Sequence, residues 1–276
     1  MEITNRNFYR LLRSGAFNEH QQLEAMSQFK WQRIIQLASA QDVSIYIANG
    51  FFKCKDDTSL HLSSELWSEL QPLKGEPLPD ITATTLSIMK AEPLPANVLL
   101  RHRMKRIIKK DDESEDSSIA TQQLLRIIVH NTSETLTHGI SLRGIIEMGR
   151  FLRQRGNRVD YIKLEAWLQK LGFSRFASLL GSILIRFFGF DLNEIPFMQS
   201  EEKNAVSLAR RSLENTASDT AENWHFRMRT NGMVENNSRV LRRNMRRSVR
   251  YLRYNPFETT SNFLANFARS LAEIEE

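Results

Sequence analysis

Apolar residues recur at intervals of three and four positions along most of the chain, which places their side chains on one face of an α-helix. One clear example, within residues 29–38, consists of Phe29, Trp31, Ile34, Ile35 and Ala38. The alternation typical of strands does not recur, although the β-branched residues of 42–52 suit either a short helix or a strand. The pattern predicts a mainly α multi-helix bundle, with allowance for a small residual α+β part near the N-terminus.

Composition divides this pattern into three regions. Residues 1–71 form an N-terminal helical region, in which Ser27 stands where a helix would begin. Residues 72–117 hold five of the seven prolines, a basic helix near 101–110 and the acidic run DDESED at 111–116. A block of like charges is typically solvated, so we expect this run to be a mobile loop within a linker. Residues 118–276 form a C-terminal helical domain, in which Ser141 and Asp160 begin helices and Gly172 ends one.

Positive charge is concentrated near the C-terminus. The net charge is +6, and residues 227–254 contain nine arginines but only one acid, Glu235. If residues 238–254 are one helix, seven arginines share an arc of about 140°. These are Arg239, Arg242, Arg243, Arg246, Arg247, Arg250 and Arg253. Apolar residues occupy a separate arc of about 80°, which we expect to pack against the bundle. They are Leu241, Met245, Val249 and Leu252.

Arginine side chains on one helix face repel each other unless anions bind to them. Three partners fit: nucleic-acid phosphates, an anionic lipid surface, or acidic protein groups, which include the chain's own DDESED and terminal AEIEE. The most apolar stretch, residues 176–190, is interrupted by Arg186 and is too short to span a bilayer, so it predicts a buried helix. With no transmembrane segment and no secretory leader expected, the sequence predicts a cytoplasmic protein.

A second segment combines packing and polar residues at helical spacing. In residues 138–156, one stripe predicts a core-facing surface and comprises Leu142, Ile145, Ile146, Gly149 and Leu152. On the adjoining flank, Arg143 and Glu147 are four residues apart and can form an ion pair. This pair is interpreted either as a structural polar edge or as a group that orients a loop or phosphate at an interdomain cleft.

Catalytic and metal-binding motifs do not appear. The six histidines form no ligand cluster, and no nucleophile elbow, phosphate-binding loop or dinucleotide fingerprint is present. The single cysteine, Cys54, excludes an intrachain disulfide. It lies between Lys53 and Lys55, whose charges can lower the pKa of a thiol, but a lone cysteine is far more often incidental than nucleophilic. We therefore assign no catalytic residue, no metal ligand and no cofactor.

Two segments nevertheless resemble an uncharacterised bacterial nucleotidyltransferase family. In FKWQRIIQLASAQDVS, residues 29–44, a tryptophan precedes a helix, and Gln41-Asp42 replaces the family's His-Gly pair. In the second segment, from residue 138 to Asp191, Leu142-Arg143 and Glu147 match an L-R-x-x-x-D helix, with Glu in place of Asp.

The resemblance covers the family's helical flanks but not its catalytic core. It implies a mixed sheet with a Gly-Ser turn and a D-x-D pair that holds Mg²⁺, and neither feature occurs between the two segments. We therefore expect a pseudoenzyme, a helical interaction or scaffold module whose basic helix meets an anionic partner. The alternatives are a degenerate but active transferase that uses Mg²⁺ with a nucleoside triphosphate, and a nucleic-acid or membrane-surface binder.

Overall fold

The computed structural model describes residues 2–54, 57, 60, 62–198, 200–219, 227–228, 234–235 and 238–272, with side chains omitted for 213–219, 227–228, 234–235, 238–243 and 269–272. Its helices are α1 (Ile3–Phe17), α2 (Gln28–Ala40), α3 (Ser44–Lys53), α4 (Ser64–Leu70), α5 (Ile81–Lys90), α6 (Val98–Asp112), α7 (Ile119–Thr137), α8 (Leu142–Arg155), α9 (Tyr161–Leu171), α10 (Ser174–Phe188), α11 (Ala205–Asp219), α12 (Ser238–Tyr251) and α13 (Pro256–Ala272). Short 3₁₀ turns are η2 (Gln71–Leu73), η3 (Gly156–Arg158) and η4 (Leu192–Glu194). Strands β1 (Arg227–Met228) and β2 (Val234–Glu235) pair antiparallel. The prediction of a mainly α multi-helix bundle is confirmed.

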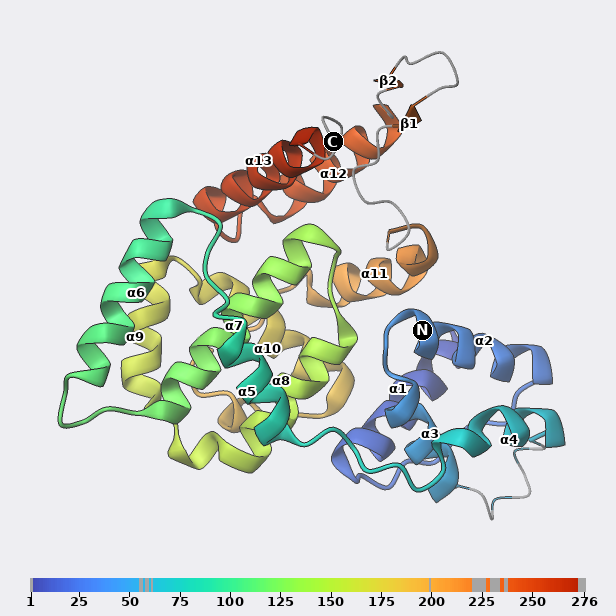
Figure 1. Ribbon diagram of the computed structural model, residues 1–276. Coiled ribbons are helices and arrows are strands. Elements are labelled where there is room, and N and C mark those ends of the chain that lie inside the picture. The colour runs from blue at the N-terminus through green and yellow to red at the C-terminus, as the bar shows by residue number, and fades with distance from the viewer. Residues whose placement is uncertain are drawn as a thin grey trace.

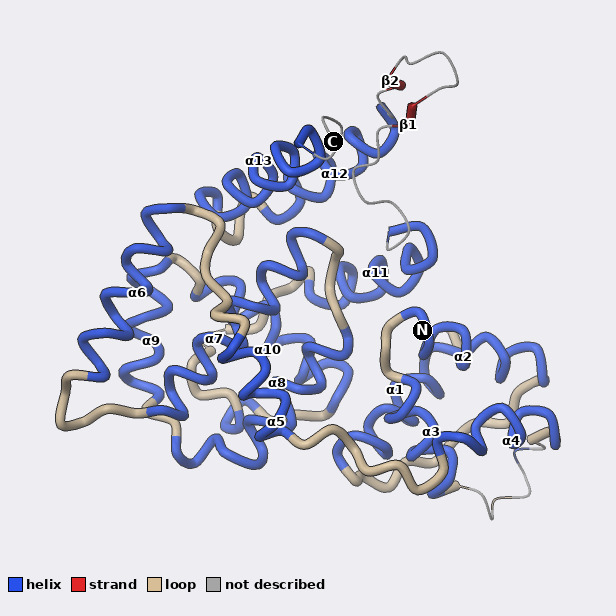
Figure 2. Tube along the Cα trace, in the orientation of Figure 1, coloured by secondary structure: helices blue, strands red, loops and turns tan. Residues whose placement is uncertain are grey.

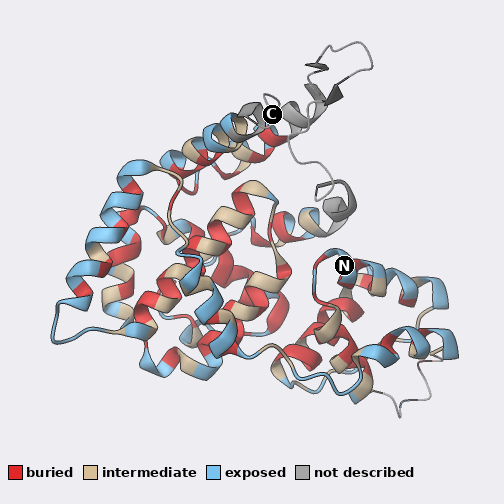
Figure 3. Ribbon diagram, in the orientation of Figure 1, coloured by how far each residue is buried: buried red, intermediate tan, exposed pale blue. Residues whose placement is uncertain are grey.

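Figure 1 shows α7, α8 and α10 in the middle of the molecule, with α6 and α9 along one side and the α12–α13 hairpin across another. Helices α1 to α4 form a separate group, and the loop that precedes α5 connects this group to the central helices (Figure 2). Buried residues concentrate on the central helices and on the inward faces of α1 and α3 (Figure 3). One hydrophobic core contains buried residues from every helix from α1 to α12.

The N-terminal group is built on a close crossing of α1 and α3. A Cβ atom added to Gly15 would overlap the Tyr46 carbonyl, and one added to Gly50 would overlap the Leu11 carbonyl. Only glycine permits two helix backbones to approach this closely. The group contacts the central helices through α10, where the rings of Tyr9 and Phe187 stack with centroids 4.3 Å apart.

Local sequence signals explain most helix boundaries. Ser141 and Asp160 accept hydrogen bonds from the backbone N–H groups of Gly144 and Lys163, and Gly172 ends α9 at a φ of 70°. Ser27 precedes α2, but its side chain makes no capping hydrogen bond. Residues 44–53, which suited a helix or a strand, form α3. The described residues of 1–71 are helices and loops, without the small α+β part for which the sequence left room.

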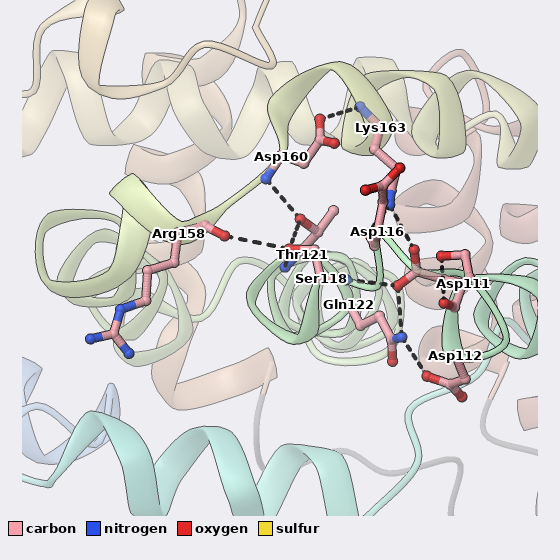
Figure 4. A network of polar contacts seen from close by, with 10 residues as sticks. Asp111, Asp112, Asp116, Ser118, Thr121, Gln122, Arg158, Asp160 and Lys163 are labelled. Atoms are coloured by element: carbon pink, nitrogen blue, oxygen red, sulfur yellow. Dashed lines mark hydrogen bonds and ion pairs between the residues drawn. The ribbon is translucent and has the colours of Figure 1, made fainter.

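The acidic run differs from its prediction at its start, where the chain is still helical. Asp111 and Asp112 belong to the last turn of α6, and Asp111 is only 5% exposed. Figure 4 shows the Asp111 carboxylate between α7 and α9, where it accepts from Lys163 Nζ and Gln122 Nε2, each at 2.9 Å, and from Ser118 N at 3.2 Å. Buried carboxylates with several donors are structural anchors rather than loop residues. Asp111 therefore clamps α6 to α7 and α9, which corrects the expectation of a solvated loop for this residue, whereas the other five residues of the run are exposed, as expected.

Candidate anion-binding cleft

The α8 segment forms a polar contact with the N-terminal group. Arg143 Nε donates to Glu147 Oε1 at 2.9 Å, while its Nη1 donates to Asp42, at the end of α2. On the next turn, Arg150 Nη1 donates to Pro79 O at 2.7 Å. Glu147 also borders a cavity of about 10 Å³, which has room for about one water molecule. The polar contacts of this segment hold helices together, and the cavity beside Glu147 is too small for a ligand larger than water.

The packing face of α12 differs from the prediction. The helix is buried through Asn244, Arg247 and Tyr251, whereas Met245 and Val249 of the apolar stripe are 49% and 65% exposed. Leu252, just beyond the helix, is also exposed, and the side chain of Leu241 lies outside the described residues. The expectation that this stripe packs against the bundle is therefore wrong.

Two contacts explain the orientation of α12. Arg247 Nη1 donates to the carbonyl oxygen of Thr137, the last residue of α7. The final carbonyls of a helix lack partners within the helix and carry partial negative charge, so a guanidinium satisfies them well. Tyr251 packs on Phe176 of α10, with ring centroids 6.0 Å apart, and Tyr254 packs on the same ring at 5.4 Å. Aromatic side chains bury more area than Val or Leu, which favours this face as the anchor.

The seven predicted arginines consequently do not form one exposed set. Arg247 is buried and bonded to α7, which corrects its assignment to an open anion-binding face. Arg246 and Arg253 are exposed, and Arg250 is half-buried. The side chains of the remaining three lie outside the described residues, and these are Arg239, Arg242 and Arg243.

A cleft of about 270 Å³ lies where the end of α12 faces the start of α11. Of its three lining arginines, Arg250 comes from α12, Arg253 from the turn that follows α12, and Arg211 from α11. The remainder of the lining is mostly polar and comprises Asn204, Ser207 and Leu208. Three arginines, from α11, from α12 and from the turn after α12, therefore line one open space large enough for a phosphate group.

The position of Arg253 within the cleft is fixed by its neighbours. Its Nη2 donates to the Tyr254 hydroxyl at 2.6 Å and lies 3.6 Å from Glu202 Oε2. In the amide orientation that satisfies both groups, Asn204 Oδ1 accepts from Arg253 Nη1 at 2.7 Å. The hydrogen bond to Tyr254 raises the pKa of Arg253, so its positive charge is permanent. Arg253 is thus a preorganised cation at one end of the cleft.

The other two arginines have no comparable neutralisation. Among the described residues, no carboxylate lies within ion-pair distance of Arg211 or Arg250. Like charges that converge on one space repel each other, and an anion between them removes that repulsion. Guanidinium groups also present paired N–H donors that match the oxygen spacing of phosphate and carboxylate. The cleft therefore has the charge and the donors to bind an anion.

The described residues supply little chemistry beyond binding. Ser207 is the only hydroxyl in the cleft, and it donates to Asn204 O at 2.9 Å rather than to a base. No group of three or more His, Cys, Asp or Glu side chains in the described chain could hold a metal ion. Burial raises the pKa of Cys54 and outweighs the opposing effect of Lys53, so the two neighbouring lysines do not activate this thiol. The described lining of the cleft thus supplies mainly cationic donors.

Sequence reasoning singled out Arg250 and Arg253 but missed Arg211. The Arg210-Arg211 pair within α11 was the available signal, yet only the tertiary fold brings it beside α12. Comparison of the chain with family models, with curated proteins and with solved structures finds no match. In the described part of the chain, no helix combines the length and apolar character needed to cross a bilayer.

Proposed function

We propose that this protein is a non-catalytic, anion-binding interaction module that receives a phosphate-bearing partner in the cleft between α11 and α12. One observation carries the proposal: Arg211, Arg250 and Arg253 converge on a single space of about 270 Å³. Among the described residues, Arg211 and Arg250 have no carboxylate within ion-pair distance. No ion pair within the described protein therefore competes with an anionic ligand for these two guanidinium groups.

The proposal includes descent from the nucleotidyltransferase-like family without transferase activity. Asp42 has a φ of 53°, a conformation that favours glycine, and it stands where that family has glycine. The described residues of 45–100 form helices α3, α4 and α5 rather than a sheet that could hold converging carboxylates. A cytoplasmic location belongs to the same proposal, because a chain with one cysteine suits a reducing compartment.

Calorimetric titration with pyrophosphate tests the binding site. The wild-type protein should bind one pyrophosphate per chain, and Arg250→Gln or Arg211→Gln should weaken binding at least tenfold. A hydrogen bond to a charged group contributes about 1.5–3 kcal/mol, which is the basis for this factor. The matched control is Arg106→Gln, which removes an exposed arginine from the basic helix α6 and should leave the affinity unchanged.

Two results would contradict the proposal. Equal affinities for wild type, Arg250→Gln and Arg106→Gln would show that pyrophosphate is attracted by net charge and not by the cleft. Transfer of labelled nucleotide to any acceptor in the presence of Mg²⁺ and a nucleoside triphosphate would contradict the non-catalytic assignment and support the degenerate transferase instead.

A further inference from the structure

The surface beside the cleft is apolar as well as basic. Met245 and Val249 lie one turn apart on α12, and Leu252 follows the last residue of that helix. They are 49%, 65% and 42% exposed, and they stand on the flank next to Arg246, Arg250 and Arg253. In Figure 3 the α12–α13 hairpin lies along an outer edge of the molecule. Exposed apolar residues grouped in this way mark interaction surfaces.

The charge of this surface selects among partners. Residues 238–254 contain seven arginines and no acid, and Arg246 has no carboxylate within ion-pair distance among the described residues. A nucleic acid would engage the arginines and leave the apolar side chains in water. A lipid bilayer with anionic headgroups engages both, because apolar side chains enter the acyl boundary while arginines remain at the phosphates.

We infer that Met245, Val249 and Leu252 dock on an anionic lipid surface, with Arg246 at the headgroups and a lipid phosphate in the adjoining cleft. This inference rests on the proposed function for the phosphate contact, and it names the source of that phosphate as a membrane lipid. The exposed apolar stripe, which does not pack in the core, is then the part that enters the bilayer.

Sedimentation with vesicles tests the inference. Wild-type protein should pellet with vesicles of phosphatidylcholine and phosphatidylserine at 7:3, and remain in solution with phosphatidylcholine alone. Val249→Asp should reduce pelleting at least tenfold, and Arg246→Gln should reduce it about fivefold, as expected for one arginine at an anionic surface. Ile162→Asp is the matched control, since Ile162 is 87% exposed on α9, and it should pellet like wild type.

Pyrophosphate affinity, measured beside vesicle binding, separates this inference from the proposed function. Val249→Ser, which removes the apolar side chain without adding a charge beside Arg250 and Arg253, should retain full pyrophosphate affinity while its vesicle binding weakens, which would support both statements. Wild-type protein that binds pyrophosphate but stays in solution with anionic vesicles would overturn the lipid inference alone. Two further results would also overturn it: a homodimer that Val249→Asp converts to a monomer, or RNA binding that depends on Arg246 but not on Val249.

Discussion

The substitution Asp111→Asn should destabilise the whole fold, because it removes the charge that the α6–α7–α9 clamp is built around. The wild-type carboxylate accepts from Lys163, Gln122 and the backbone of Ser118, and its side chain is 2% exposed. An asparagine presents one oxygen and one NH₂ group, so one of three donors would face another donor. The Lys163 ammonium would also lose its anionic partner.

The size of the effect follows from the exposure of the two partners. Removing one member of a fully buried ion pair costs about 3–5 kcal/mol. Lys163 is 22% exposed and also donates to the Asp116 carbonyl, so it keeps part of its solvation. We therefore expect a loss of about 1.5–3 kcal/mol. For a chain of this size, that loss lowers the melting temperature by about 3–10 °C.

Thermal unfolding followed by circular dichroism would measure the loss, with Asp116→Asn as the matched control. Asp116 lies in the same acidic run, but only its backbone carbonyl contacts Lys163, so its replacement should change the melting temperature little. Equal melting temperatures for Asp111→Asn and Asp116→Asn would refute the clamp. A double-mutant cycle with Lys163→Met should show that the two losses are not additive.

The effect should also depend on pH. Burial acts to raise the pKa of Asp111, but hydrogen bonds from Gln122, Lys163 and Ser118 outweigh it and hold the pKa below its ordinary value. A carboxyl whose pKa is lowered by folding stabilises the protein above its unfolded pKa of about 3.9, and this stabilisation is lost as the pH falls through the folded value. The stability difference between wild type and Asp111→Asn should therefore shrink below about pH 4.

Three further predictions concern other parts of the fold. Gly15→Ala should cost at least about 2 kcal/mol by forcing α1 away from the Tyr46 carbonyl, and an unchanged urea midpoint would refute the close crossing. Arg247→Gln should cost about 1.5–3 kcal/mol because it removes a charged donor from the end of α7, whereas exposed Arg246→Gln should change unfolding by less than about 0.5 kcal/mol. Hydrogen bonds from Arg6 lower the pKa of Glu24 to about 2. The ion pair between Arg6 and Glu24 should therefore persist above pH 4 and be lost as the pH falls through about 2, which a carboxyl NMR titration would show.

Local signals predicted the helices because helices are local structures. The spacing of Ile145 and Ile146, the cap at Ser141 and the glycine at 172 depend only on neighbours in the chain, and each stands in the structure where these rules place it. Within the acidic run, the prediction was wrong for Asp111, because its donors come from α7 and α9, which no local pattern reveals.

The cleft was only half predictable for a similar reason. The arginine periodicity identified Arg250 and Arg253, but the orientation of α12 depends on the end of α7, to which Arg247 is bonded across a long stretch of sequence. Because Arg247 faces the end of α7, the apolar stripe of α12 faces outward, and the end of α12 lies beside α11. Arg211 became a cleft residue through this packing, and the Arg210-Arg211 pair in the sequence does not show which helix it will lie beside.

The most direct test of anion binding in the cleft is an NMR titration of the arginine Nε–Hε resonances with inorganic phosphate. The signals of Arg211, Arg250 and Arg253 should shift together along one saturable curve, while the signal of Arg106 on α6 stays in place. Shifts of similar size at all four arginines, without saturation, would contradict a site in the cleft and indicate only the general attraction of phosphate to a basic protein.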